Sequence, residues 1–236
     1  MRITYIHHSG FLAETGQALL LFDYAGGTLP ELSRDKALIV FASHRHGDHF
    51  DPAIFALADR HPDVTYVLSD DIWENQVPEA RFGQTRFVDP GKVLRLNKGG
   101  GICITAFRST DEGVAFMIET EGRTLYHAGD LNDWHWNGEA PEWNQKMHTD
   151  YLRELERIHS QGFVPDAAMV PLDGRLEDKF CLGLDEFMTA VGAGMVFPMH
   201  LWEDYSLIGK LKALPCSEAY RDRIADIEKP GDVFEV

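Results

Sequence analysis

The segment His44-Arg45-His46-Gly47-Asp48-His49 gathers three of the eleven histidines of this 236-residue chain, together with an aspartate. It follows the apolar run 38–41, so His44 and His46, two positions apart at the end of a strand, can direct both imidazoles toward one point. Asp48 and His49, which also have side chains that bind metals, follow in the turn. Imidazoles this close would repel one another on protonation unless something held them. The segment therefore predicts a metal site, with a solvated polar loop as the alternative.

The charge of the chain restricts its partners. A formal net charge of −16 disfavours binding to nucleic acids, whose phosphates call for clustered Lys and Arg. The chain lacks a signal-like start and any apolar run near the ~20 residues that span a bilayer. Cys103, Cys181 and Cys216 form no C-x-x-C pair, which is typical of reduced thiols rather than disulfides or a thiolate zinc site. We expect a cytoplasmic protein with a small-molecule substrate; a homo-oligomer is left open.

The residue pattern alternates strands with helices and predicts one domain over 1–236, of mixed α/β class. Runs of apolar and β-branched residues predict strands at 3–6, 11–14, 18–22, 38–41, 64–68, 85–88, 92–96, 102–107, 115–120, 124–127, 167–170 and 195–197. Helical periodicity and capping residues predict helices at 52–58, 70–76, 147–159, 184–191 and 217–227, the first with Asp51 as its cap and Pro52 in its first turn.

One long segment, 134–144, departs from the regular pattern. It contains Trp134, Trp136 and Trp143 among Asn, His, Gly and Pro residues, which predicts an ordered loop. Aromatic side chains in a loop can form the wall of a pocket, or they can cover the core as a hydrophobic plug. The sequence favours neither alternative.

Two further ligand candidates follow predicted strands. Asp130 comes after the strand 124–127 through Ala128-Gly129, where small residues allow the backbone to approach a metal. His200 comes after the strand around 195–197. Functional side chains commonly lie at strand ends, so we expect both to join the histidine segment. A turn aspartate and a hydrogen-bonded core histidine are the respective alternatives.

These residues in this order resemble the metallo-β-lactamase-fold superfamily. The His8-Ser9-Gly10-Phe11 segment and Asp23 after the third strand resemble the branch of metal-dependent hydrolases that includes ascorbate-phosphate lactonase-like and N-acyl-phosphatidylethanolamine phospholipase D-like proteins. The resemblance implies a four-layer αββα sandwich with metal at one edge. It also implies that His44, His46 and a third histidine hold a first metal, that Asp48, His49 and His200 hold a second, and that Asp130 bridges them.

The chain departs from this pattern at the third histidine. No histidine lies between His61 and His127, and the corresponding segment reads Arg108-Ser109-Thr110-Asp111-Glu112-Gly113. Hydroxyls of Ser109 and Thr110 are poor zinc ligands. We therefore expect one strongly bound divalent cation, zinc, in the second site, and a first site that is weak, empty or completed by His8, Asp111 or a water. An oxygen-rich first site would favour manganese or iron. The alternatives are a hydrogen-bonded His8 and a solvated pair of acidic residues at 111–112.

Three residues are expected to act outside the ligand set. Asp173, after the strand 167–170, can hydrogen-bond a ligating histidine or only cap a turn. Arg175 can meet an anionic substrate, although a salt bridge with Glu177 is the favoured interpretation. His127 is expected to be structural rather than a proton carrier.

A cation held by His and Asp with an open position lowers the pKa of water from near 16 to about 7, which supplies a nucleophile at neutral pH. We therefore expect a metal-dependent hydrolase that uses activated water on a small ester, lactone or phosphorylated metabolite, with Asp48 orienting the water or accepting its proton. The alternatives are a phosphodiesterase or nuclease, which the acidity disfavours, and a non-catalytic metal-binding or sensor protein with a degenerate first site.

Overall fold

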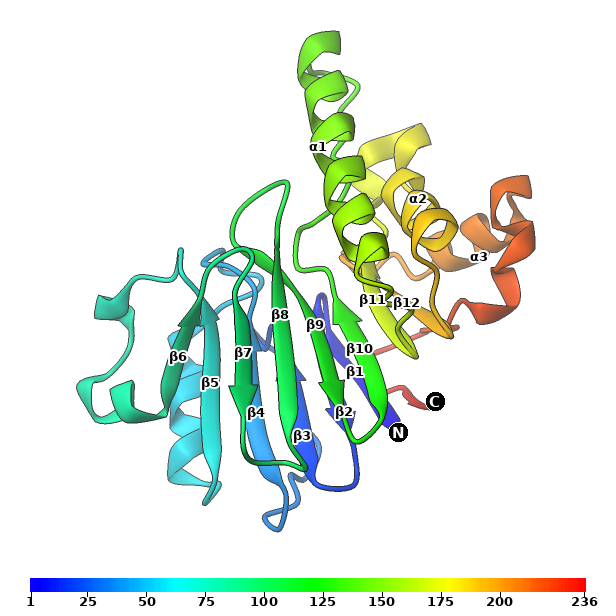
Figure 1. Cartoon of the computed structure of the whole chain (residues 1–236). Helices are drawn as coiled ribbons and strands as arrows, with labels where there is room; N and C mark the ends of the chain where they lie inside the picture. The colour runs from blue at the N-terminus through cyan, green and yellow to red at the C-terminus, as the bar shows by residue number, and fades with distance from the viewer.

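Two β-sheets lie face to face with helices outside them in the computed structural model, which describes residues 1–236 (Figure 1). The first sheet has the strand order β13 (Val233–Glu235), β1 (Arg2–His7), β2 (Gly10–Glu14), β3 (Ala18–Phe22), β4 (Ala37–Ala42), β5 (Val64–Ser69) and β6 (Thr85–Val88). The second has the order β12 (Met195–Met199), β11 (Ala167–Pro171), β10 (Arg123–His127), β9 (Val114–Thr120), β8 (Ile102–Arg108) and β7 (Val93–Leu96).

The helices connect these strands. Three are α-helices: α1 (Pro141–Ser160), α2 (Leu182–Ala190) and α3 (Ser206–Ala213). Six are short 3-10 helices: η1 (Pro52–Asp59), η2 (Glu74–Gln76), η3 (Glu79–Gln84), η4 (Gly174–Lys179), η5 (Pro215–Ala219) and η6 (Arg221–Arg223). No helix is both long and apolar enough to cross a membrane.

Aromatic contacts define the four layers. Between the sheets, Phe41 of β4 meets Phe116 of β9 with ring centroids 5.2 Å apart. On the outer face of the second sheet, Tyr126 stacks on Phe187 of α2 at 4.8 Å, and α1 lies beside α2. On the outer face of the first sheet, η1 covers the strands through buried apolar side chains. The predicted αββα sandwich is confirmed.

Strand direction brings the polar loops to one edge. Strands β3 to β6 run parallel to one another, as do β10 to β12, so the carboxyl ends within each group lie on the same side. The loops after β4, β10, β11 and β12 therefore present their side chains next to one another. Of these strands, β4, β11 and β12 are almost entirely buried, which explains their apolar sequences.

Several predicted helix boundaries were wrong. Helix α1 begins at Pro141, six residues before the predicted start at 147, because proline fits the first helical position and Glu142 favours the positive helix end. Residues 141–144 of the predicted tryptophan loop therefore belong to the helix. The predicted closing helix at 217–227 is replaced by η5 and η6, and the helix at 70–76 by the three residues of η2. Helix α3 and the terminal strand β13 were not predicted.

Candidate metal centre

The loop after β4 is held tightly against the start of β9. The backbone N–H of Val114 donates to the carbonyl of Ser43 at 2.9 Å, and Gly113, with φ of 69°, makes this approach feasible. A Cβ at Gly113 would lie 2.0 Å from the Ser43 oxygen and 2.6 Å from the His44 Cβ. This glycine therefore allows His44 to be buried at the sheet edge.

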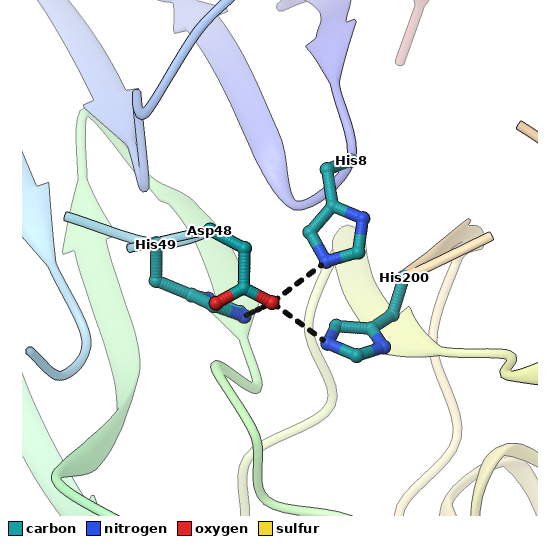
Figure 2. Close-up of side chains that lie close together, drawn as sticks. All are labelled: His8, Asp48, His49 and His200. Atoms are coloured by element: carbon teal, nitrogen blue, oxygen red, sulfur yellow. Dashed lines mark ion pairs between the residues drawn. The ribbon is translucent and has the colours of Figure 1, made fainter. Parts of the chain in front are cut away.

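Four side chains form the group that we call the second group: His8, Asp48, His49 and His200. The Asp48 Oδ2 atom lies 3.3 Å from His8 Nε2, 3.9 Å from His49 Nε2 and 3.7 Å from His200 Nε2. Figure 2 shows the three imidazoles, from the β1–β2 turn, the β4 loop and the end of β12, pointing toward this carboxylate. The backbone N–H of His200 donates to the His8 carbonyl at 3.3 Å, which holds the two turns together.

The first group consists of His44, His46, Asp111 and Asp130. His44 Nε2 lies 3.0 Å from His46 Nδ1 and 3.6 Å from Asp130 Oδ2, and His46 Nδ1 lies 3.7 Å from Asp111 Oδ2. The other Asp130 oxygen, Oδ1, lies 3.2 Å from His49 Nε2 and 3.6 Å from His200 Nε2. The Asp130 carboxylate thus stands between the two groups, with one oxygen facing each.

The residues of the second group fit a divalent cation. Four buried atoms lack any hydrogen-bond partner: His8 Nε2, His49 Nε2, His200 Nε2 and Asp130 Oδ1. Buried polar atoms are costly without partners, and all four face the same small volume. Ligands about 2.0–2.2 Å from a zinc ion lie roughly 3.3 Å apart in a tetrahedral arrangement, and the separations above bracket that spacing.

Three of the buried histidines are oriented through their other ring nitrogen. His49 Nδ1 donates to Asp23 Oδ2 at 2.7 Å, and His200 Nδ1 donates to Asp173 Oδ2 at 2.8 Å. His44 Nδ1 lies 3.0 Å from Ser43 Oγ, whose hydroxyl in turn donates to Asp23 Oδ2 at 2.6 Å. Such partners fix the tautomer and leave Nε2 free for a ligand role. Asp173 also caps η4 by accepting from the Arg175 N–H, so it makes both of the hydrogen bonds that were predicted for it.

The site favours positive charge at its centre. Burial alone would raise the pKa of Asp130, but the charge of the neighbouring His49 outweighs this and lowers it. Burial and the charge of His49 lower the pKa of His44 to about 4, so this imidazole is neutral at physiological pH. Burial likewise lowers the pKa of His8. Burial would lower the pKa of His49, but Asp130 and Asp23 outweigh this and raise it, so His49 carries a proton that a bound cation would displace.

Of the residues considered as substitutes for the missing third histidine, Asp111 lies beside His44 and His46 in the first group. Ser109 and Thr110 belong to neither group, because their hydroxyls bind backbone: Ser109 Oγ accepts from the Asp111 N–H, and Thr110 Oγ1 donates to the Asn132 carbonyl at 2.6 Å. Glu112 pairs with Arg45 at 2.5 Å.

His8 lies in the second group rather than the first, where it was considered as a substitute. His127 has a structural role, because its Nε2 donates to the Ser9 carbonyl at 2.9 Å and its Nδ1 accepts from the Gly129 N–H at 3.2 Å. Both of its ring nitrogens are therefore occupied within the fold.

A cavity of about 290 Å³ opens beside the two groups. Its walls are formed by His46, Asp48, Asp111, Asp130, Trp134, Trp136, Trp143, Met147, Arg175 and His200. The three tryptophans therefore line a pocket, which decides between the two alternatives for their segment. Trp134 and Trp136 stack with their centroids 6.2 Å apart.

The favoured salt bridge between Arg175 and Glu177 was wrong. Arg175 pairs with Asp173 through Nε at 2.9 Å and Nη2 at 2.5 Å, while Glu177 accepts from Asn137. The guanidinium lies over the rings of Trp136 and Trp202, 5.6 and 4.6 Å from their centroids. The short turn after β11 brings Asp173 closer to Arg175 than any residue of the following helical turn.

The role of Asp23 in orienting His49 was missed, although its position at the end of the apolar run 18–22 was a usable signal. A fully buried carboxylate after an interior strand needs hydrogen-bond donors, and Asp23 receives them from Ser43 and His49. Trp202 was also missed. Its position two residues after His200 gives no pattern that predicts an aromatic contact with Arg175.

A family model described as a beta-lactamase superfamily domain matches residues 2–137, more than half of the chain. A relative from Pyrobaculum arsenaticum named a UPF0173 metal-dependent hydrolase is 30% identical over 257 residues, covering 100% of both chains. A relative from Pyrobaculum aerophilum with the same family name is 27% identical, again over the full length. The solved structure of Igni18, a metallo hydrolase from Ignicoccus hospitalis, superposes with a TM-score of 0.67 at 18% identity, covering 100% of this chain and 98% of that one. The chain therefore belongs to the beta-lactamase superfamily and, within it, to the UPF0173 metal-dependent hydrolases.

Proposed function

We propose that the protein hydrolyses a small, anionic ester, lactone or phosphorylated metabolite with water activated at the candidate metal centre. The observation that carries this proposal is the convergence of two ligand groups on Asp130 beside an open cavity. A cation site that only stabilised the fold would be closed by its ligands, whereas here several ligand candidates also line a pocket.

The second group, together with Asp130, is proposed to hold the more tightly bound cation. It supplies three imidazoles and two carboxylates, from His8, Asp48, His49, His200 and Asp130. Zinc suits such a nitrogen-rich set. The first group is proposed to hold the other cation more weakly, because Asp111 is half-exposed and replaces an imidazole. This group consists of His44, His46, Asp111 and Asp130. The higher share of oxygen in this group makes manganese or iron an alternative there.

A bound cation supplies Lewis acidity and lowers the pKa of water toward neutrality, which provides the nucleophile. The chain's own residues supply positioning. The His8 imidazole, 3.3 Å away, lowers the pKa of Asp48, so this carboxylate is ionised. It also reaches the cavity, and it can accept a hydrogen bond from the attacking water and orient it toward a bound substrate.

The cavity walls support the substrate class. A volume of about 290 Å³ suits a small metabolite, and three tryptophan side chains favour a substrate with an apolar or planar portion. Arg175 is the positively charged side chain on the cavity wall. Its guanidinium has N–H donors that are not used in the bonds to Asp173. A phosphate or carboxylate on the substrate would meet this side chain.

The test is a screen of metal-loaded protein against esters, lactones and phosphate esters, in pairs of equal size that differ only in an anionic group. We expect turnover with a preference for the anionic member. Asp48→Asn should reduce kcat by about 100-fold or more, in line with loss of a general base. The exposed Asp70 provides the control variant Asp70→Asn, which should not change kcat.

Two results would contradict the proposal. Cleavage of RNA with no cleavage of any ester, lactone or phosphate ester would indicate a nuclease. Full metal occupancy with no turnover of any substrate, and saturable binding of a small anion, would indicate a sensor.

A further inference from the structure

Three titratable side chains meet behind the wall of the catalytic pocket. Asp133 lies in the loop after β10, His148 is on α1 and Glu186 is on α2. His148 Nδ1 lies 2.7 Å from Asp133 Oδ2 and 3.3 Å from Glu186 Oε1. None of the three belongs to either ligand group of the candidate metal centre.

The hydrogen bonds within this cluster leave both carboxylates incompletely satisfied. His148 Nδ1 carries at most one proton, which two carboxylates share. Asp133 is 0% exposed, and its Oδ1 has no hydrogen-bond partner; the buried Glu186 Oε2 also has none. No Lys or Arg forms an ion pair with Asp133 or Glu186. Burial and the charge of Asp133 raise the pKa of Glu186 to about 7, which reflects the shortage of positive charge.

We infer that Asp133, His148 and Glu186 form an accessory site for a divalent cation, of the zinc or manganese class. The ligand atoms of the three residues lie within 4.8 Å of one another, and the 3.3 Å between His148 Nδ1 and Glu186 Oε1 equals the spacing of neighbouring ligands of one ion. The 2.7 Å contact between His148 and Asp133 is a hydrogen bond that a cation would replace. One imidazole with two carboxylates is a ligand set that zinc, manganese and iron accept.

Water can complete the coordination of this site. A cavity of about 520 Å³ reaches both Asp133 and His148, and it is separate from the pocket of the candidate metal centre. Solvent and a cation can therefore enter without passing through the substrate pocket. An open side also distinguishes this cluster from a sealed hydrogen-bonded core.

An ion at this site would join the pocket wall to the helix layer. Asp133 is followed by Trp134, whose Nε1 donates to the Asp130 carbonyl at 2.9 Å and whose ring lines the substrate pocket. A cation that binds Asp133 together with α1 and α2 would hold this segment at three points. The site therefore serves to position the tryptophan wall, and it does not depend on which reaction occurs there.

The first test counts metal ions in full-length protein equilibrated with Zn²⁺, desalted and analysed by plasma mass spectrometry. His148→Gln and Glu186→Gln should each hold one ion fewer per chain than the wild type. His159→Gln and Glu156→Gln change exposed residues of the same types on α1 and should match the wild type. Equal zinc content in all five proteins would overturn the inference. It would indicate that a proton on Glu186, rather than a cation, compensates for the shortage of positive charge in the cluster.

A second test does not depend on variants that fold. Crystals of the wild-type protein soaked in zinc chloride should show an anomalous peak among Asp133, His148 and Glu186. Peaks at the candidate metal centre with none at this cluster would overturn the inference. A peak here remains informative even if the protein hydrolyses none of the proposed substrates, so the two proposals can fail separately.

Discussion

His49 donates a hydrogen bond from Nδ1 to Asp23 Oδ2 at 2.7 Å, and both side chains are fully buried. The same carboxylate accepts from the Ser43 N–H and hydroxyl, so it fixes the histidine to the strand that precedes the loop. Burial would raise the pKa of Asp23, but His127 and His49 outweigh this and lower it. The carboxylate therefore stays ionised and holds the His49 ring with Nε2 toward the candidate ligands Asp48 and Asp130.

Asp23→Asn should weaken zinc binding by about 10- to 100-fold, the usual effect of removing a carboxylate behind a ligating histidine. The amide that replaces one oxygen turns an acceptor into a donor and faces the donors of Ser43 and His49. Competition with a chromophoric chelator measures this change. Unaltered zinc affinity in a folded Asp23→Asn protein would show that His49 does not bind the ion, and Asp70→Asn is the control.

Gly113→Ala should destabilise the protein by about 3 kcal/mol or more, because its Cβ would overlap backbone and a non-glycine residue at this φ is itself strained. Gly122 has nearly the same φ, 72° against 69°, but open space around it. Gly122→Ala should therefore cost only about 1 kcal/mol. Urea unfolding of the two variants separates the contact from the strain. Equal losses in both would mean that the approach of Gly113 to Ser43 contributes nothing.

The sequence predicted the sheets and the location of the site because both depend on short-range patterns. The apolar runs 18–22 and 38–41 are almost wholly buried in parallel strands, and the polar residues that follow them could only lie at a strand end. Asp130 and His200 were placed by the same reasoning, although each role as a ligand stays a prediction.

The features that could not be predicted depend on contacts between segments that are distant in the sequence. The distribution of His8 and Asp111 between the two groups follows from how the β1–β2 turn and the segment before β9 pack at the sheet edge, which no local pattern encodes. The partner of Arg175 was missed because a tight turn brought a nearer carboxylate to it. The end of the chain was misread because 217–227 has helical periodicity, while β13 forms only by pairing with β1.

Glu186 gives a pH dependence that can be measured in metal-free protein. Its pKa rises from 4.5 to about 7 on folding, so folding favours the protonated form. The resulting stabilisation is complete below pH 4.5 and is lost as the pH rises through 7, and it amounts to about 3 kcal/mol. Urea unfolding with chelator at several pH values, compared with Glu186→Gln, measures it. The free energy of unfolding of the wild type should fall relative to that of Glu186→Gln as the pH rises. A difference between the two proteins that stays constant with pH would contradict the buried state of this carboxyl group.

His8→Ala and Asp111→Ala should affect different ions. His8 faces Asp48, His49 and His200, so its loss removes an imidazole from the nitrogen-rich group and should weaken the tighter zinc-binding step by about 10-fold or more. Asp111 faces His44 and His46, so its loss should weaken only the looser step. Calorimetric titration of metal-free protein with Zn²⁺ resolves the two steps, and the Glu186→Gln background keeps the accessory cluster out of the measurement. Two unchanged steps in the His8 variant would remove His8 from the ligand set, and a tighter step weakened by Asp111→Ala would reverse the proposed order of the two groups.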